Sequence, residues 1–375
     1  MRAFYLRMTV QGPDSLPAWL IFSALYPFSL LYGLIVVLRR TLYAWGLLSR
    51  YRAKVPVISV GNLTVGGTGK TPVVDALVKE LLGRGKAVAV VSRGYRGRFA
   101  GRWARVIGEG TDALQSAAEA GDEPFLLAMR NPAARVYVAR ERRFGVMAAE
   151  ADGAEVIVLD DAFQHLAVAR DLDIVLLDAR RPFGNGALLP AGSMREPRQT
   201  LQLAGQVILT HAEDNDQARK LDHSSVQCKH RLAKDNDQTR NLDLSSVQCQ
   251  HRLAEALVDL QGQTISWDQV KGRPCLAFAG IARAEDFFDD LRAAGCQLVA
   301  TMPLDDHQDY DQDTLARIRA TSANAEYLLT TEKDAVKLQD VTFAVPCLAV
   351  PLTVAFENFA ELTERLDDLW GDRHA

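Results

Sequence analysis

A glycine-rich run, GGTGKT at residues 66–71, most strongly limits what this chain can fold into. It follows a short apolar, β-branched run at residues 55–60 and precedes a helical pattern over residues 72–82. This order of strand, glycine-rich turn and helix is the context of a phosphate-binding loop, or P-loop. Glycines let backbone N–H groups turn toward phosphates, and the helix N-terminus adds positive potential. The run therefore predicts a nucleotide site in an α/β domain.

One position departs from the general P-loop pattern. Thr64 stands six residues before the lysine, where that pattern has glycine. We predict that Lys70 contacts the β- and γ-phosphates and that the Thr71 hydroxyl holds Mg²⁺. The predicted nucleotide-binding residues are Thr64, Gly66, Gly67, Thr68, Gly69, Lys70 and Thr71.

Short apolar runs alternate with helical patterns along the rest of the chain. Predicted strands lie at residues 86–91, 135–138, 155–159, 173–177 and 206–210. The alternation is typical of a doubly wound, mainly parallel α/β sheet. The same style continues over residues 275–350, which predicts a second, smaller α/β domain. An acidic amphipathic stretch at residues 356–370 predicts a C-terminal helix.

The segment from Ser15 to Leu38 holds no charged residue. As a helix its 24 residues would reach about 36 Å, enough to cross a hydrocarbon core of ~30 Å. A cleaved signal peptide and a buried soluble helix are alternatives, but a membrane anchor, spanning or monotopic, fits best. Arg39 and Arg40 follow directly, and the excess of basic residues after the segment predicts that the body is cytoplasmic.

Overall composition excludes two classes of protein. The 375 residues carry 43 basic and 47 acidic side chains, a net charge of −4, which argues against a basic nucleic-acid coat protein. The five cysteines are sparse and lack CxxC spacing, so they indicate a reducing compartment rather than a disulfide framework.

An internal repeat separates the two predicted domains. Residues 214–233 recur at residues 235–254 with 16 of 20 positions identical. A tandem duplication within a surface loop is the favoured interpretation, because lengthening a loop costs little free energy. The alternative is a zinc site made of Cys228, His230, Cys249 and His251. Duplicating one Cys and one His produces four such residues automatically, so the spacing carries no independent information.

Two acidic pairs are candidates for metal binding or catalysis. Asp160 and Asp161 follow an apolar strand, where a P-loop enzyme needs a metal-binding acid; an ordinary turn is the alternative. Asp122 and Glu123 in GDEP could instead cap the helix that follows them. Arginines alternate with aromatic residues over residues 93–105. That pattern suits phosphate or anionic lipid, an exposed hairpin or, less well, nucleic acid.

Eight motifs in this order resemble the tetraacyldisaccharide 4'-kinase (lipid A 4'-kinase) family. They are VGNLTVGGTGKTP (60–72), SRGY (92–95), GDEP (121–124), LDDAFQH (159–165), PAGSMREP (190–197), FAGIAR (278–283), the pair Asp306-His307, and TEKDAVKL (331–338). The resemblance runs from the N-terminal helix to about residue 350. Ala162 stands where many relatives have glycine, whereas Thr64 agrees with the family.

The resemblance implies a membrane-bound kinase of Gram-negative bacteria with two P-loop-like α/β/α domains and the active site between them. It would transfer the γ-phosphoryl group of ATP to the 4'-hydroxyl of tetraacyldisaccharide 1-phosphate, giving lipid IVA. It implies that Asp122, paired with His307, is the base for the sugar hydroxyl. The implied Mg²⁺ ligands are Thr71, Glu123, Asp160 and Asp161. The implied substrate contacts are Arg93, Tyr95, Arg142, Gln164, His165 and Arg195.

Four parts are therefore expected. They are an N-terminal membrane anchor helix at residues 1–45, a P-loop kinase domain at 46–205, a linker with the duplicated loop at 206–270, and a second α/β domain with a C-terminal helix at 271–375. The expected location is the inner membrane, with the catalytic domains on the cytoplasmic side. Neither a specific nucleic acid nor a protein partner is predicted. The alternative function is a membrane-associated P-loop NTPase acting as a switch or motor, although the NKxD signature of many switches does not occur.

Overall fold

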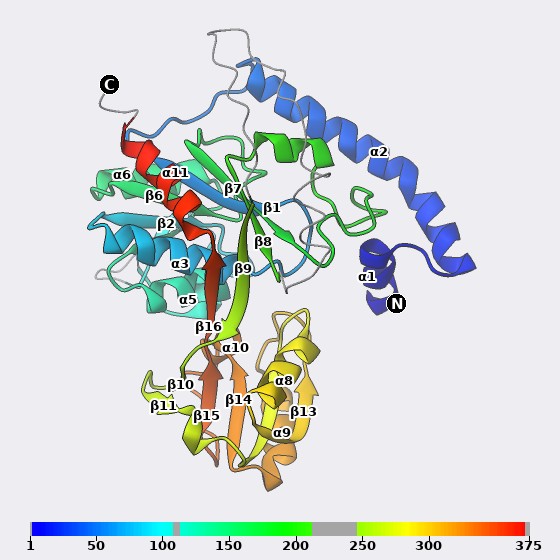
Figure 1. The fold of residues 1–375 in the computed structure, drawn as a ribbon, viewed down its shortest axis with the longest axis vertical. Helices are drawn as coiled ribbons and strands as arrows, with labels where there is room; N and C mark the ends of the chain where they lie inside the picture. Colours follow the sequence, from blue (N-terminus) through cyan, green and yellow to red (C-terminus); the bar gives the residue numbers. More distant parts are fainter. Residues whose placement is uncertain (1, 108–112, 212–245, 372–375) are drawn as a thin grey trace.

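The computed structural model of the chain describes residues 2–107, 113–211 and 246–371. Two α/β domains lie one above the other, and a long N-terminal helix runs along the side of the upper one (Figure 1). We call the domain that carries the glycine-rich loop the first domain and the other the second domain. The fold confirms the predicted α/β class with mainly parallel sheets.

The first domain is built on a sheet with the order β16-β9-β8-β7-β1-β6-β2-β5-β3-β4 in the described residues. Its strands are β1 (Val57–Asn62), β2 (Val88–Ser92), β3 (Ala104–Val106), β4 (Ala113–Leu114), β5 (Arg135–Val138), β6 (Val156–Asp160), β7 (Leu172–Asp178), β8 (Gln206–Thr210), β9 (Ser246–Leu253) and β16 (Leu352–Glu357). Strands β9 to β5 in that order are parallel, whereas β16 is antiparallel to β9 and β3 is antiparallel to β5; β4 runs parallel to β3. Every residue of β1, β2 and β6 is buried, as expected for parallel strands covered on both faces.

Helices cover this sheet and close its core. They are α3 (Lys70–Gly83), α4 (Ala117–Ala120), α5 (Asp122–Arg130), α6 (Arg142–Ala151) and α11 (Phe359–Gly371). Val74, Leu77 and Val78 of α3 are buried against the sheet. This packing fixes the direction of α3, so that its N-terminus meets the loop that follows β1.

The second domain has the strand order β11-β10-β15-β14-β12-β13. Its elements are β10 (Ala256–Asp259), β11 (Thr264–Ser266), β12 (Pro274–Ala279), α8 (Ala284–Ala293), β13 (Gln297–Pro303), α9 (Gln312–Thr321), β14 (Tyr327–Thr331), α10 (Glu332–Ala335) and β15 (Cys347–Val350). Strands β12 to β15 are parallel, and β10 and β11 are an antiparallel pair at one edge. Phe278, Phe288 and Leu328 are fully buried between this sheet and its helices.

The domain boundaries differ from those expected. The described parts of the expected linker at 206–270, residues 206–211 and 246–270, belong to the two domains, because β8 and β9 lie in the first sheet and β10 and β11 in the second. The chain also returns to the first domain after β15, where β16 pairs with β9 and α11 packs on the first core. Figure 1 shows α11 in red on the upper domain. Leu362 and Leu366 are buried there, which explains why the C-terminal helix does not stay with the second domain.

The second repeat copy contains a core strand rather than surface loop alone. Its residues 246–253 form β9, and Val247 and Cys249 are fully buried, in alternation with more exposed neighbours. This alternation is expected for a strand with one face on the core. Strand β9 pairs with β8 on one side and with β16 on the other. Cys249 is a free, buried thiol, which does not suit a zinc site. The first copy, residues 214–233, with Cys228 and His230, lies outside the described residues.

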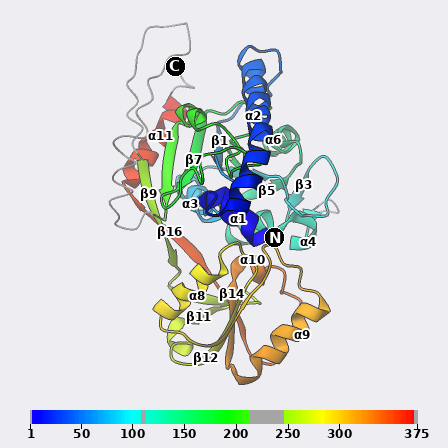
Figure 2. The same cartoon turned by 90° about the vertical axis from the view of Figure 1, so that its right-hand side faces the viewer.

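The N-terminal helices α1 (Arg2–Gln11) and α2 (Leu16–Ala44) lie along one side of the first domain (Figures 1 and 2). Among the described residues, α2 is the one helix long and apolar enough to cross a membrane. Large apolar side chains such as Leu20, Leu30 and Leu34 are exposed on it. Pro27 lies inside this helix without ending it.

Candidate active site

The glycine-rich loop joins β1 to α3 as the sequence predicts. Gly69 caps α3 with a left-handed backbone (φ 71°), and a Cβ there would lie only 2.1 Å from His251 Nε2. Both observations require glycine at this position. Thr64 is buried, and its backbone forms an isolated β-bridge with Met194. The buried hydroxyl of Thr68 has no hydrogen-bond partner among the described residues.

Lys70, at the start of α3, lies within an acidic and polar cluster. Its Nζ is 3.2 Å from Asn62 Oδ1 and 3.5 Å from Asp161 Oδ1. The Arg195 Nη1 donates to both carboxylate oxygens of Asp161 at 3.0 Å. Burial opposes the ionisation of Asp161, but Lys70 and Arg195 outweigh it and hold its pKa below the usual range. This cluster is therefore charged and arranged before any ligand binds.

The pKa of Asp160, the last residue of β6, is shifted in the opposite direction to that of Asp161. Burial raises its pKa to about 6, with further contributions from Asp161 and Glu123. Ser92 Oγ donates to Asp160 Oδ2 at 3.1 Å. Two adjacent carboxylates thus have their pKa values pushed apart, which is characteristic of functional sites.

Asp122 and His307 meet across the two domains. His307 Nδ1 lies 3.0 Å from Asp122 Oδ2, and both side chains are about nine-tenths buried. The Lys337 Nζ is 3.1 Å from the same oxygen. Burial opposes ionisation of Asp122, but the hydrogen bond from His307 and the charge of Lys337 hold its pKa below the usual range. The carboxylate is therefore ionised and oriented.

A second lysine contacts the imidazole itself. The Lys333 Nζ is 3.0 Å from His307 Nε2 and 3.2 Å from Glu123 Oε1. Because an ammonium group can only donate, Nε2 accepts its hydrogen bond and Nδ1 carries the ring proton. That tautomer donates to Asp122. The sequence motif at residues 331–338 contained both lysines, but nothing in its spacing indicated that they would reach the acids of the first domain.

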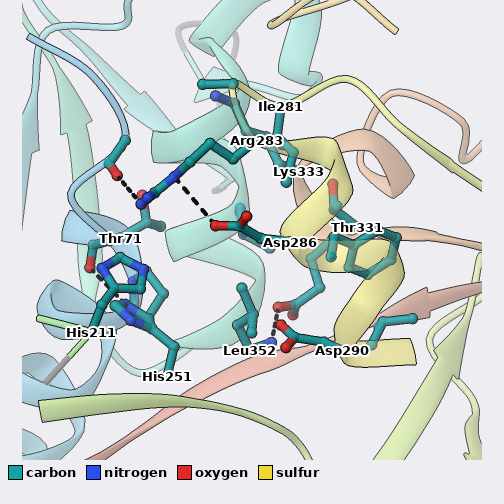
Figure 3. Close-up of a pocket in the computed structure, with 18 of the residues that line it drawn as sticks. Thr71, His211, His251, Ile281, Arg283, Asp286, Asp290, Thr331, Lys333 and Leu352 are labelled. Carbon is teal, nitrogen blue, oxygen red and sulfur yellow. Dashed lines mark hydrogen bonds and ion pairs between the residues drawn. The ribbon is translucent and has the colours of Figure 1, made fainter. Parts of the chain in front are cut away.

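A cavity of about 710 Å³ lies between the domains beside the P-loop. The first domain contributes Gly67, Gly69 and Thr71, and the second domain contributes Ile281 and Phe287. Figure 3 shows Arg283 and Asp286 on one side of this cavity and His211 and His251 on the other. Its lining includes Glu123 and Lys333, whereas Asp122, Asp160, Asp161 and Arg195 are outside it. The cavity therefore includes part of the glycine-rich loop and Glu123, but neither Lys70 nor the acids at the end of β6 line it.

Several lining residues carry no signal in the sequence. The rings of His211 and His251 lie 4.6 Å apart, and His251 Nε2 is 3.5 Å from the carbonyl oxygen of Gly69. Burial and the neighbouring His251 lower the pKa of His211 to about 3, so its ring is neutral. Arg283, in the FAGIAR motif, donates to Asp178 Oδ2 at 3.1 Å and bridges the domains. Arg283 lay in a recognised motif without an assigned role, His251 was considered only as a zinc ligand, and the lone His211 gives no pattern that would identify it.

The predicted substrate residues lie around this site in different ways. Arg93 and Tyr95 are exposed on the loop after β2, and the Tyr95 ring lies edge-on to His307, 5.3 Å between centroids. Gln164 Nε2 donates to the carbonyl oxygen of Asn62, at the end of β1. Burial lowers the pKa of His165 to about 4, and its buried Nε2 has no partner among the described residues. These positions converge on the carboxyl ends of β1, β2 and β6, where ligands bind in such sheets.

Arg142 differs from the prediction of a substrate contact. Its side chain is buried, with 2% of its surface exposed, and it donates to the carbonyl oxygens of Asp160 and Ala139. Burial lowers its pKa to about 10. The guanidinium supports the end of β6 from behind, because α6 begins at this residue and directs it under the sheet edge rather than outward.

The predicted Mg²⁺ ligands do not form a ready-made acidic cage. Within residues 2–107, 113–211 and 246–371, no group of three or more His, Cys, Asp or Glu side chains is arranged to hold a metal ion. A P-loop enzyme needs fewer protein ligands, because Mg²⁺ takes oxygen atoms from one or two side chains, from water and from substrate phosphates. The buried Asp160 carboxylate, whose ionisation burial and the neighbouring acids oppose, is a hard oxygen donor that a cation would stabilise. The donor set fits the ion.

A parallel α/β domain with a P-loop, an acid at the end of the adjacent strand and a second carboxylate paired with a histidine from another domain defines a P-loop phosphotransferase. The comparisons with known proteins make this specific. The family model described as tetraacyldisaccharide-1-P 4'-kinase matches residues 21–370. The tetraacyldisaccharide 4'-kinase of Syntrophotalea carbinolica is 45% identical, with 98% of this chain and 97% of that protein covered. That of Pelobacter propionicus is 40% identical, with 98% of each covered.

A solved structure is similar over the same length. It is a crystal structure of LpxK from Aquifex aeolicus in complex with ATP, with 32% identity, a TM-score of 0.74, and coverage of 93% of this chain and 99% of that one. The chain therefore belongs to the tetraacyldisaccharide-1-P 4'-kinase family. The resemblance inferred from the eight sequence motifs is confirmed, and so is the enzyme class, a kinase of lipid A biosynthesis that binds ATP.

Proposed function

We propose that this chain transfers the γ-phosphoryl group of ATP to the 4'-hydroxyl of tetraacyldisaccharide 1-phosphate, giving lipid IVA. One observation carries the assignment of the site: the Asp122–His307 pair lies at 3.0 Å across the domain interface, next to Glu123 at the end of the P-loop cavity. A sugar hydroxyl placed there would face an oriented carboxylate on one side and the terminal phosphate on the other.

The proposed steps divide between the two parts of the site. Lys70 and the backbone N–H groups of the loop hold the phosphates, and Lys70 balances charge that moves onto the leaving oxygen. Asp122 accepts the proton of the sugar hydroxyl as the bond to phosphorus forms. Its low pKa suffices, because a loose phosphoryl-transfer transition state asks little basicity of the base. His307 holds the carboxylate in place through Nδ1.

The residues that would hold Mg²⁺ in this proposal are Thr71, Asp160, Asp161 and Glu123. When bound, the ion would neutralise negative charge on the transferred phosphoryl group. The Arg195 guanidinium, already paired with Asp161, is proposed to contact the substrate's phosphate or sugar. Arg93, Tyr95, Gln164 and His165 are proposed to line the rest of the disaccharide site, whereas Arg142 supports it from beneath.

Membrane attachment through α2 is also part of the proposal, with the catalytic domains on the cytoplasmic side of the inner membrane. We infer that α2 lies along the bilayer surface rather than across it. Ser29, in the middle of the apolar segment, accepts from the backbone N–H of Ala191 and donates to the carbonyl oxygen of Leu188. A spanning α2 would place this loop of the catalytic body in hydrocarbon, where exposed polar backbone is not tolerated.

The kinase activity is tested with purified protein, Mg²⁺-ATP and tetraacyldisaccharide 1-phosphate, with mass spectrometry of the lipid product. A gain of one phosphate at the 4'-position is expected. Hydrolysis of nucleotide without a phosphorylated lipid would contradict the proposal and favour the switch or motor alternative.

The orientation of α2 is tested by labelling single cysteines in intact cells. We expect Gly12→Cys, before α2, and Gly46→Cys, after it, to react with a membrane-impermeant thiol reagent only after the inner membrane is opened. Reaction of Gly12→Cys in intact spheroplasts would show that α2 crosses the bilayer.

A further inference from the structure

The loop at residues 184–197 is held between α2 and the phosphate-binding loop. On one side, Val65 N donates to the Ser193 carbonyl at 2.7 Å, and Arg195 N donates to the Leu63 carbonyl at 2.7 Å. On the other side it meets α2, where a Cβ at Gly33 would lie only 2.7 Å from Leu188 Cδ1. The loop therefore has a fixed position only while both neighbours are in place.

Besides the contacts to Leu188 and Ala191, two side chains of α2 contact the residues at the end of this loop. Tyr32 Oη donates to the carbonyl oxygen of Arg195 at 2.9 Å. Arg40 Nε donates to Glu196 Oε2, and the side chain of Glu196 is 3% exposed. A carboxylate so deeply buried depends on its cationic partner, because an unpaired charge in a low-dielectric interior is strongly unfavourable.

Arg40 also contacts the strand-end segment that carries the acids. Its guanidinium lies 4.9 Å from the centroid of the Phe163 ring, and Nη2 is 3.4 Å from the Phe163 carbonyl oxygen. Phe163 is fully buried and lies two residues after Asp161. One side chain of α2 thus joins the segment of Asp161 to the segment of Arg195, whose side chains pair with each other at 3.0 Å.

We propose that Arg40 is a positioning residue for the kinase. By pairing with Glu196 and Phe163, it fixes Arg195 against Asp161. The correct position of α2 on the catalytic body is therefore required for turnover and not only for membrane attachment. This inference rests on the proposed function, in which Arg195 and Asp161 act at the phosphate end of the site. It makes the arrangement of that end depend on the anchoring helix.

The test is a mutant cycle between Arg40 and Arg195, measured on full-length protein with detergent-dispersed substrate. We expect Arg40→Met to lower kcat on the order of tenfold with little change in the KM for ATP, and Arg40→Lys to recover part of the loss. Arg195→Met should cost more. If Arg40 acts through Arg195, the double variant should be no slower than Arg195→Met alone. Arg7→Met, an exposed arginine of α1 paired with Asp14, is the matched control.

Binding to vesicles of phosphatidylethanolamine and phosphatidylglycerol separates positioning from attachment. Arg40→Met should bind these vesicles like the unmodified protein while its kcat is reduced. Two outcomes would overturn the proposal. One is a double variant whose loss of kcat equals the product of the losses in Arg40→Met and Arg195→Met. The other is an Arg40→Met variant that has normal kcat but no longer binds vesicles. If Arg40→Met does not fold, Tyr32→Phe, which removes only the hydrogen bond to the Arg195 carbonyl, should show the same kcat loss in smaller degree, and an unchanged kcat would count against the idea. An unmodified protein without kinase activity would instead contradict the proposed function.

Discussion

The phosphate end of the site, Lys70, Asp161 and Arg195, belongs entirely to the first domain. The proposed catalytic pair joins Asp122 of the first domain to His307 of the second. Contacts within one sheet edge stay in place whatever the domains do, whereas the pair exists only when the domains meet. The difference indicates that ATP phosphates can bind to a surface that the first domain forms alone. Phosphoryl transfer, in contrast, would require the second domain to be docked, because His307 comes from it.

Removal of the central cation of the phosphate end should have the largest effect. Lys70→Ala is expected to lower kcat/KM for ATP on the order of 10³-fold, because in the proposed site Lys70 faces the phosphates and its Nζ also lies 3.5 Å from Asp161 Oδ1. Steady-state kinetics and isothermal titration with ATP measure the two parts of the loss. Lys79→Ala, on the same helix and 52% exposed, is the control. Equal losses in the two variants would contradict a phosphate role for Lys70.

The two ends of the site also differ in how well the sequence predicted them. The P-loop and the acids after β6 follow local rules, since a strand, a turn and a helix contiguous in the chain determine where they lie. The pairing of Asp122 with His307 came only from the family resemblance, because 185 residues separate them. Lys333 and Lys337 were in a recognised motif but received no role. Their reach to Glu123 and Asp122 depends on how two domains dock, which no local pattern encodes.

The same reasoning applies to the fold. Strands with continuous apolar runs, such as β1 and β6, were predicted within a residue or two. Strand β9 was missed because only Val247 and Cys249 are buried in it, and its sequence is otherwise polar. The prediction that the first domain ends at residue 205 was wrong for the same reason. Because β9 was missed, its pairing with β16, which brings the end of the chain back to the first domain, was missed as well.

Loss of the carboxylate at the domain interface should separate chemistry from binding. Asp122→Asn is expected to lower kcat on the order of 10²-fold, because the amide cannot accept the hydroxyl proton. ATP affinity should stay within about twofold, since the phosphate end lies in the first domain alone. Stopped-flow or quench kinetics with parallel nucleotide titration make the measurement, with Asp268→Asn, which is highly exposed, as the control. A matching loss of ATP affinity would remove the distinction between the two ends.

Substitution of Asp160 should show how much stability the fold loses by burying an ionised carboxylate at the end of β6. Its pKa of about 6 in the folded chain exceeds the 3.8 of an unperturbed aspartate, so ionisation above pH 6 destabilises the folded state relative to the unfolded one. Asp160→Asn is expected to raise the free energy of unfolding at pH 8 by up to ~3 kcal/mol, with activity lost. The gain should shrink as pH falls through 6 and vanish near pH 4. Chemical denaturation at several pH values tests this, and a pH-independent difference would contradict it.

The smallest expected effect concerns the cation that orients the imidazole from the second domain. Lys333→Met removes the donor 3.0 Å from His307 Nε2 and the partner of Glu123, so the ring loses one of the two contacts that select its tautomer. We expect kcat to fall roughly tenfold, about the value of one charge-assisted hydrogen bond. Lys333→Arg should recover part of it. The measurement is kcat at saturating ATP and lipid in steady-state kinetics.

The control for this variant is Lys271→Met, an exposed lysine of the same domain that pairs with Asp268 at 4.0 Å. If Lys333 orients the imidazole by donating to Nε2, kcat should fall in Lys333→Met and recover in part in Lys333→Arg, whereas Lys271→Met should leave kcat unchanged. An unchanged kcat in Lys333→Met, or no recovery in Lys333→Arg, would mean that Lys333 does not act through His307. The proposed catalytic pair would then depend on the second domain for the position of His307 and not for the hydrogen bond from Lys333.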